Sequence, residues 1–394
     1  MPFSIAPLLM GGGIRMDVIY SIGAKLAGGG IGDTAYHAVK SIYKHGYLKK
    51  VYCLDYGEIE IEKEKVGKVR LAYVFSLPMR AINRYISKNF NHYWYTDRFY
   101  DLCVSKMLEK CDIFHGWNNH SLRSLRKAKE SGAITVIERA SSHPIIQEKL
   151  LMQEFKLFGI ERKRNPSIER SCKELEECDY VTIPSDFVKE TFIEIGFPEE
   201  KLIKIPFGVD VKKFEFEREE SDKFIVLFVG QVGLRKGVQY LLKAWKELNL
   251  KDSELRVCGK IAPEFEMFVK KYKNDNVKFL GFVKDVLEEY KKASVFCFPS
   301  IEDGFGLAPL EAMAGHTPVI VSENTGSKDL IRDGKDGFVV PIRDVKALKE
   351  KILYFYENPE EIKRMGRNAR KHVEKYTWER YGEELVRAYE RLIY

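Results

Sequence analysis

Hydrophobic residues follow two alternating patterns along the chain from residue 16 onward. Short runs rich in β-branched and aromatic residues predict buried strands, and longer stretches with apolar residues at every third or fourth position predict amphipathic helices. Strands that alternate with helices are typical of parallel sheets covered by helices. In the first half, the stretches that we interpret as strands are DVIYSI, KVYCLD, KVRLAYV, CDIFHG, ITVIER and DYVTIP.

A charged stretch over residues 206–223 interrupts this alternation, and a new series of strands begins directly after it. At 394 residues the chain exceeds the size at which one hydrophobic core usually stops growing. We therefore predict an α/β fold with two doubly wound parallel-sheet domains, residues 1–206 and 207–375, followed by an amphipathic helix over 376–394. The strands expected in the second domain are FIVLFVG, ELRVCGK, NVKFLGF, SVFCFPS, TPVIVSE and GFVVP.

Charge and cysteine content narrow the class of protein. Residues 1–150 hold 22 lysines and arginines against 14 aspartates and glutamates, an excess that suits an anionic partner but is more often a solvated surface. No arginine-rich tract or RNA-binding aromatic signature accompanies it, so we expect no nucleic-acid partner. Seven cysteines without a Cys-x-x-Cys spacing predict reduced thiols and a cytoplasmic location. The opening MPFSIAPLLMGGGI lacks a basic n-region, and we expect the first fifteen residues to be a start-site extension or a flexible tail.

A glycine cluster in AKLAGGGIGDTAYHAV raises one function directly. Gly30, Gly32 and Ala35 have the spacing of a dinucleotide-binding fingerprint, and Asp55 stands where such folds place a ribose ligand. Against this interpretation, we place the end of the preceding strand at Gly23, seven residues before the fingerprint's second glycine position, whereas a dinucleotide turn starts at the strand end. An NAD-dependent oxidoreductase stays an alternative.

The second half carries a denser group of polar residues in the loops that follow predicted strands. Asp303 and Glu311 flank two glycines, in EDGFGLAPLE, at a helix expected to begin near Leu307. Backbone amides at such a helix start favour an anion, and the Glu311 carboxylate can accept hydrogen bonds from a ribose diol. Arg235 and Lys236 lie at another strand-to-helix loop and supply positive charge for a diphosphate. Alone, the two acidic residues would indicate only a favourable helix start.

Together these motifs resemble the retaining, nucleotide-sugar-dependent glycosyltransferases of the GT-B fold, the glycosyl transferases group 1 that include glycogen synthase-like and phosphatidylinositol mannosyltransferase-like enzymes. The resemblance implies two Rossmann-like domains facing a cleft, with the helix 376–394 packed back on the first domain. It implies that Asp303 contacts the donor sugar, that Glu311 binds the ribose and that Lys236 grips the diphosphate. The loop that it places beside the diphosphate consists of Gly304, Phe305, Gly306 and Leu307.

Two positions depart from the pattern of this family. Gln231, an uncharged hydrogen-bonding residue that we assign to the donor site, follows Gly230 where many members have an arginine. Arg235 is the residue that can supply the missing charge. The first acidic residue of the family's E-x7-E is Asp303 here, and Glu302 precedes it, so either carboxylate can reach the sugar; position favours Asp303. If Gln231 disables donor binding, the chain is a non-catalytic sugar-binding protein.

Polar residues of the first half follow predicted strands in the same way. His115 and Trp117 follow one strand, and Arg139 and His143 follow the next; we assign His115, Trp117 and Arg139 to the acceptor. His143 is the nearest candidate for a catalytic histidine, with Arg139 as its rival. Under the glycosyltransferase interpretation Gly30 and Gly32 approach the diphosphate.

The stretch MRAINRYISKNFNHYWYTDRFYD mixes cationic and aromatic residues, Lys88 and Phe90 among them. It suits a glycan acceptor, an anionic membrane surface or plain helix packing.

The expected reaction moves a sugar from a nucleotide-diphosphate sugar to a glycan or lipid-linked acceptor. Negative charge that develops on the leaving phosphate would be stabilised by Lys236, Arg235 and loop amides. The chain has no Asp-x-Asp, so we expect neither a metal nor any other cofactor besides the donor substrate. Retention of configuration is implied by the resemblance alone. A nucleotide-sugar 2-epimerase of the same fold stays a further alternative, and base, sugar, acceptor and linkage stay open.

Overall fold

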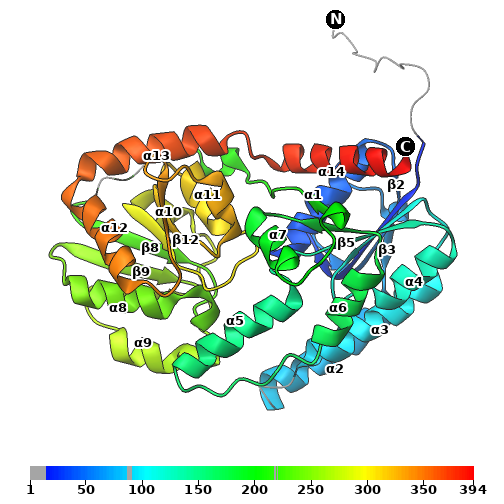
Figure 1. Cartoon of the computed structure of the whole chain (residues 1–394), viewed down its shortest axis with the longest axis horizontal. Helices are drawn as coiled ribbons and strands as arrows, with labels where there is room; N and C mark the ends of the chain where they lie inside the picture. The colour runs from blue at the N-terminus through cyan, green and yellow to red at the C-terminus, as the bar shows by residue number, and fades with distance from the viewer. Residues whose placement is uncertain (1–14, 87–90, 217–218, 220) are drawn as a thin grey trace, which may run out of the picture. The chain divides into compact units, whose positions relative to one another are not determined.

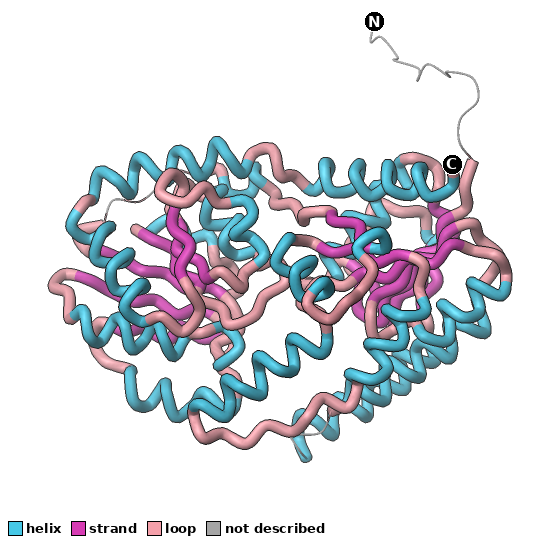
Figure 2. The backbone as a smooth tube through the Cα atoms, in the orientation of Figure 1, coloured by secondary structure: helices cyan, strands magenta, loops and turns pink. Residues whose placement is uncertain are grey.

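The computed structural model describes residues 15–86, 91–216, 219 and 221–394 and contains two sheets, shown in Figure 1. The first fifteen residues of the predicted extension, except Arg15, and both Lys88 and Phe90 of the mixed stretch lie outside the described residues. In Figure 2, helices lie on both faces of the strands of each sheet. The prediction of parallel-sheet α/β architecture is thereby confirmed.

The first sheet has seven strands in the order β3-β2-β1-β4-β5-β6-β7. Strand β1, which lies inside the sheet between β2 and β4, is mostly apolar and almost completely buried, as a strand covered on both faces must be. The strands are β1 Val18–Leu26, β2 Leu48–Tyr56, β3 Val66–Lys68, β4 Ile113–Trp117, β5 Ile134–Glu138, β6 Tyr180–Ile183 and β7 Leu202–Lys204.

The second sheet has six strands in the order β10-β9-β8-β11-β12-β13. The chain order reverses between β8 and β11, and this is the point at which open α/β sheets bind ligands beyond the carboxyl ends of their strands. The strands are β8 Phe224–Val229, β9 Ser253–Cys258, β10 Val277–Gly281, β11 Val295–Phe298, β12 Val319–Ser322 and β13 Gly337–Val340.

Helices connect most of these strands, and several of them, α1 and α8 among them, bury residues at helical spacing. In the first part of the chain the helices are α1 Ile31–Lys44, α2 Arg70–Ala81, α3 His92–Met107, α4 Leu122–Glu130, α5 Pro144–Leu157, α6 Ile168–Glu177 and α7 Asp186–Ile193, with a π-helical turn at Ile82–Ile86. The later helices are α8 Val238–Leu248, α9 Glu266–Tyr272, α10 Leu287–Lys292, α11 Leu307–Ala314, α12 Val345–Glu357, α13 Pro359–Val373 and α14 Trp378–Ile393.

By its internal contacts the chain forms two compact units, Met1–Val136 with Leu385–Tyr394, and Ile137–Glu384. The divisions fall inside β5 and α14 rather than in loops. Our domain boundary near residue 206 stays a prediction. In the structure β7 is the last strand of the first sheet, and residues 205–223 connect it to β8.

Three expectations about the first sheet are corrected. The strand expected at KVRLAYV is wrong, because α2 begins at Arg70 and only Val66–Lys68 forms a strand. The short strand β7 was not expected. Strand β1 does not end at Gly23 but continues to Leu26, so that four residues separate it from α1. The spacing argument against a dinucleotide turn at Gly30 is therefore lost.

Candidate functional site

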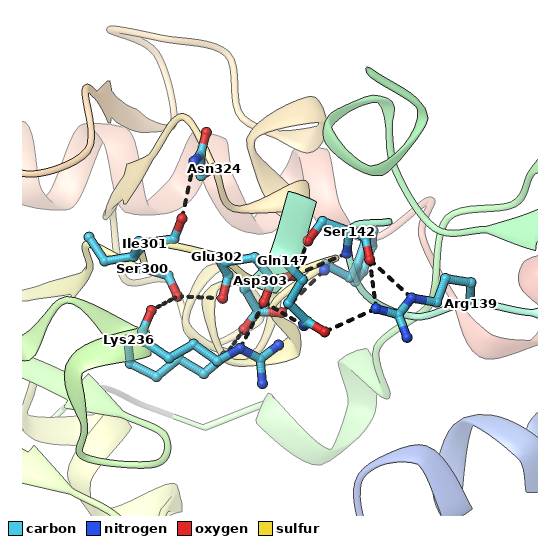
Figure 3. Close-up of polar contacts among 11 residues, drawn as sticks. Arg139, Ser142, Gln147, Lys236, Ser300, Ile301, Glu302, Asp303 and Asn324 are labelled. Carbon is cyan, nitrogen blue, oxygen red and sulfur yellow. Dashed lines mark hydrogen bonds and ion pairs between the residues drawn. The ribbon is translucent and has the colours of Figure 1, made fainter. Parts of the chain in front are cut away.

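Two strand-to-helix loops meet at the carboxyl ends of the neighbouring strands β8 and β11, and the parallel pairing of these strands brings them together. Gly237 has a left-handed φ of 67°, and a Cβ there would lie 1.8 Å from the Pro299 carbonyl oxygen, so only glycine allows this approach. The Arg235 carbonyl accepts hydrogen bonds from the Ile301 amide at 2.9 Å and from the Ser300 hydroxyl at 3.3 Å. These hydrogen bonds hold the two loops against each other. Lys236 on the first loop lies opposite Glu302 and Asp303 on the second (Figure 3).

Glu302 is fully buried, and its carboxylate accepts four hydrogen bonds from three residues of the second unit. Arg235 Nε donates to its Oε2 at 2.8 Å, and Gln147 Nε2 donates to the same oxygen at 2.9 Å. The Ser142 amide and hydroxyl donate to Oε1 at 3.0 and 2.8 Å. Burial alone would raise the pKa of Glu302, but Arg235, Gln147 and Ser142 together lower it to about 2. Glu302 therefore stays ionised and ties α5 to the Arg235 loop.

Asp303 forms an ion pair with Lys236 and keeps a small exposed fraction. Its Oδ1 accepts the Phe305 amide at 3.2 Å, and its backbone bonds to Asn324 and Gly326 at 3.0 and 2.9 Å. Burial lowers the pKa of Lys236, and the Asp303 charge opposes that effect. The sequence left both carboxylates as candidates for the donor sugar, and their contacts differ. The Glu302 carboxylate is hydrogen-bonded to protein groups, whereas Asp303 is paired with Lys236, the cation expected to bind the donor.

Helix α11 starts at Leu307, as predicted, and its first turn faces the same loops. Gly306 occupies the N-cap with φ 79° and offers no side chain to cap the helix, which leaves the first amides for a ligand or solvent. Gly304 is needed because a Cβ there would lie 2.2 Å from the Ala140 carbonyl oxygen. Ser327, whose amide donates to Phe305 at 2.6 Å, is buried, and its hydroxyl has no hydrogen-bond partner among the residues that the structure describes.

Glu311 lies one turn into α11, and the buried Tyr290 hydroxyl donates to its Oε2 at 2.9 Å. Burial raises the pKa of Glu311, and Tyr290 and Lys213 act in the opposite direction. Tyr290 orients one oxygen of the Glu311 carboxylate, and this suits a residue expected to accept hydrogen bonds from ribose hydroxyls. Gln231, near the start of the loop that follows β8, is exposed. The structure thus gathers most of the donor residues predicted in the second half at one sheet edge, and their roles stay predictions.

Arg139 and His143 follow β5 and have well-defined structural contacts. Arg139 Nη2 donates to the Ser142 carbonyl at 2.7 Å and to Gln147 Oε1 at 3.0 Å. Arg139 therefore helps to position Ser142 and Gln147, the two residues of this segment that bind Glu302. His143 caps α5 by accepting the Ile145 amide at Nδ1. Burial, followed by the Arg139 charge, lowers the pKa of His143 to about 4, so the ring is neutral near pH 7.

The four predicted residues of the first unit are held by contacts within that unit. Ala27 donates to Gly32, a Cβ on Gly32 would lie 2.0 Å from the Lys25 carbonyl, and Gly30 has φ 56°. The glycines therefore form a tight turn against the end of β1. His115 Nδ1 lies 2.6 Å from the Tyr389 hydroxyl, and Trp117 Nε1 donates to the Tyr20 hydroxyl at 2.8 Å. Their acceptor role stays a prediction.

Ser142 and Gln147 are the residues that the sequence analysis did not assign to the site. For Gln147, its spacing from His143 was a usable signal in the sequence. Gln147 follows the helix-capping His143 by four residues, so its side chain lies on the turn above the cap. The Gln147 backbone amide donates to the His143 carbonyl at 2.8 Å. No pattern in the sequence indicates that Glu302 reaches Ser142.

The fold and these loops define a class, the GT-B proteins built of two Rossmann-like domains. The sucrose-phosphate synthase of Thermosynechococcus elongatus superposes with a TM-score of 0.71 at 19% identity, over 96% of this chain and 99% of that one. Anabaena HepE, solved in complex with UDP and glucose, superposes with a TM-score of 0.66 at 14% identity, over 96% and 100%. Residues 210–372 match the family model described as glycosyl transferases group 1.

The capsular polysaccharide biosynthesis glycosyltransferase CapM of Staphylococcus aureus is similar in sequence. It is 31% identical over 225 residues, which cover 54% of this chain and 59% of CapM. The chain thus spans about three fifths of this relative. The resemblance to the group 1 glycosyltransferases of the GT-B fold, inferred from the motifs around Asp303, is confirmed.

Proposed function

We propose that this protein transfers a sugar from a nucleotide-diphosphate sugar to a glycan or lipid-linked acceptor, with retention of configuration. The observation that carries the proposal is the pairing of two cations with two carboxylates, Arg235 with Glu302 and Lys236 with Asp303, beside the uncapped start of α11. The family match over the same segment supports it. That HepE was solved with UDP and glucose supports a nucleotide-sugar donor.

The chemistry of the site fits departure of a nucleoside diphosphate. As the bond to the anomeric carbon breaks, negative charge grows on the β-phosphate, and Lys236 with the amides of residues 304–307 would stabilise it. Glu302 holds the Arg235 side chain in place, so that its guanidinium remains charged beside the same loop. Asp303 would accept a hydroxyl of the donor sugar when Lys236 turns to the phosphate, and Glu311 would accept the ribose hydroxyls.

We propose further that donor binding needs no metal ion, that the protein works in the cytoplasm and that it reaches lipid-linked acceptors by peripheral contact with the membrane. A neutral His143 suits a hydrogen-bond role near the reacting sugar better than that of a cation. The oxidoreductase, the 2-epimerase and the non-catalytic alternatives have no such support from the family match. None of them is proposed here.

Thermal unfolding with UDP, GDP, ADP and NAD in turn tests donor binding. A ligand bound to the folded state raises the melting temperature by mass action, and we expect this from one of the three nucleoside diphosphates. Lys236→Ala and Glu311→Ala should abolish the shift, whereas Lys173→Ala, on the exposed face of α6, should keep it. Stabilisation by NAD alone would overturn the proposal.

The reaction itself is tested with labelled nucleotide sugars and an extract of lipids and glycans. We expect label in an acceptor product, whose anomeric configuration by NMR decides between retention and inversion. Formation of the 2-epimeric nucleotide sugar, or of the free 2-epimer with nucleoside diphosphate by hydrolysis, without an acceptor would instead identify the epimerase. Unchanged transfer in the presence of EDTA would support metal independence.

A further inference from the structure

Helix α2 carries an exposed apolar face that the donor site does not explain. Leu71, Val74 and Leu77 lie at helical spacing on this face and are 73%, 62% and 46% exposed. Ala72 and Ser76, on the opposite side, are buried. In Figure 1 the helix runs beside α3, which covers that inner side. Among the residues that the structure describes in this unit, none covers the outer apolar face.

The stretch of sequence that contains α2 carries charge of a single sign. From Lys65 to Thr96 the sequence contains six lysines and arginines and no aspartate or glutamate. Arg70 and Arg80 are exposed at the two ends of the helix. At 100° per residue Arg70 falls between Val74 and Leu77, and Arg80 lies about 60° beyond Leu77. The face thus carries Arg70 within its apolar stripe and Arg80 along one edge.

We propose that the outer face of α2, defined by Leu71, Val74 and Leu77 with Arg70 and Arg80, docks on the surface of an anionic lipid bilayer. An interfacial helix needs apolar side chains that enter the acyl boundary and basic side chains that meet acidic headgroups, and α2 has both. Tyr85 and Ile86, which follow α2 in the chain, are 75% and 79% exposed and add to the exposed apolar surface of this segment.

A second copy of the chain is the less suitable occupant of this face. A symmetric dimer through α2 would bury Arg70, which lies within the apolar stripe, against the apolar side chains of the other copy, and α2 offers no carboxylate to pair with it. A bilayer rich in acidic lipids supplies the opposite charge to both arginines. Within the described residues no helix is long and apolar enough to cross a membrane, so the contact proposed here is with the surface.

The inference rests on the proposed function only for its purpose, which is to bring the enzyme to an amphiphilic acceptor. Its test uses neither donor nor acceptor, so a negative result is separate from failure of the transferase assay. The full chain is sedimented with vesicles of phosphatidylcholine alone and of phosphatidylcholine with phosphatidylglycerol. We expect binding to the anionic vesicles that weakens as salt is added, and weak binding to the neutral ones.

Two sets of variants locate the contact. Leu71→Ser, Val74→Ser and Leu77→Ser combined should lower partition to anionic vesicles at least about tenfold. Arg70→Gln and Arg80→Gln should each lower it about fivefold, and these changes keep the helix should the serine variant fail to fold. Leu157→Ser and Met267→Ser, which alter side chains 63% and 60% exposed in other elements, are the matched controls and should leave partition unchanged.

Three results would overturn the proposal: no binding to anionic vesicles, binding that survives both sets of α2 variants, or an equal loss in the control variants. Sedimentation velocity without lipid supplies a fourth. A dimer that the triple serine variant dissociates would assign the face to a second copy of the chain instead.

Discussion

Two consecutive carboxylates, Glu302 and Asp303, show how neighbouring residues of like charge acquire different roles. Glu302 is sequestered by Arg235, Gln147 and Ser142, whereas Asp303 makes one ion pair and keeps a small contact with solvent. A buried carboxylate with this many donors serves to position its partners. We therefore regard Glu302 as the positioning residue for Arg235.

Substitution Glu302→Gln should leave Arg235 without its buried counter-charge and lower the free energy of unfolding by about 3 kcal/mol at pH 7. The pKa of Glu302 is depressed from its ordinary 4.5 to about 2, so its contribution is present above pH 4.5 and is lost as the pH falls towards 2. Urea unfolding at pH 7 and at acid pH measures the difference between the two proteins, which should shrink on acidification.

Glu130→Gln is the control for that experiment, because Glu130 forms an exposed pair with Lys127. Its removal should cost less than about 0.5 kcal/mol. A Glu302→Gln protein with the same stability as this control would show that the buried contacts contribute nothing.

His143 gives a second prediction of how stability depends on pH, this time for a buried group that is neutral in the folded protein. Its pKa is lowered from 6.5 to about 4, so wild-type stability should decline by up to about 3 kcal/mol as the pH falls from 6.5 to 4, because only the unfolded chain takes up the proton. His143→Asn keeps a capping acceptor and removes the titration. Unfolding experiments across this range should therefore show a flatter curve for the variant, and parallel curves would contradict the buried neutral histidine. His45→Asn, at the C-cap of α1, controls for loss of a histidine elsewhere.

At the scale of elements, the site depends on how closely the loops after β8 and β11 approach. Gly237→Ala would introduce a Cβ where the Pro299 carbonyl lies, in addition to the strain of a left-handed φ. We expect a loss of more than about 3 kcal/mol and disappearance of any nucleotide-dependent thermal shift, since Arg235 and Lys236 belong to the displaced loop. Both are measured by thermal and urea unfolding with and without ligand.

Gly334→Ala separates steric overlap from backbone strain. Gly334 has a similar φ of 71°, but a Cβ there would meet no atom within 4 Å. This variant should lose only about 1 kcal/mol and keep the ligand response. Equal losses at the two positions would mean that the contact between the loops is not what requires Gly237.

Elements with a clear period were predictable from the sequence, and those without one were not. The strands around the site and the start of α11 at Leu307 follow from apolar runs that end in glycine loops. Helix α2 was mistaken for a strand because its apolar stripe at Leu71, Val74 and Leu77 faces outward, and the inner side carries the small residues Ala72 and Ser76. The meeting of Lys236 with Asp303 follows from strand ends that share one sheet edge, whereas the contact of Glu302 with Ser142 depends on packing between elements far apart in the chain.

At the scale of the whole molecule, the end of the chain belongs to the same compact unit as its beginning. Residues 385–394 join Met1–Val136, although the strands of the second sheet lie between them in sequence. Within this unit Leu385, Val386 and Tyr389 are buried, and the Tyr47 hydroxyl donates to Glu390 at 3.0 Å. Stability of the first unit should therefore depend on residues at the opposite end of the sequence.

Tyr389 tests this dependence. Its ring is 1% exposed and its hydroxyl lies 2.6 Å from His115 Nδ1, so Tyr389→Ala should cost about 4 kcal/mol through a lost aromatic ring, whereas Tyr389→Phe should cost about 1 kcal/mol through the hydrogen bond alone. Tyr394→Ala removes a ring that is 81% exposed and should cost nothing measurable. Urea unfolding of the full chain, followed by far-UV circular dichroism, ranks the three variants. If Tyr389→Ala proved as stable as Tyr394→Ala, the C-terminal residues would not be part of the first unit's core.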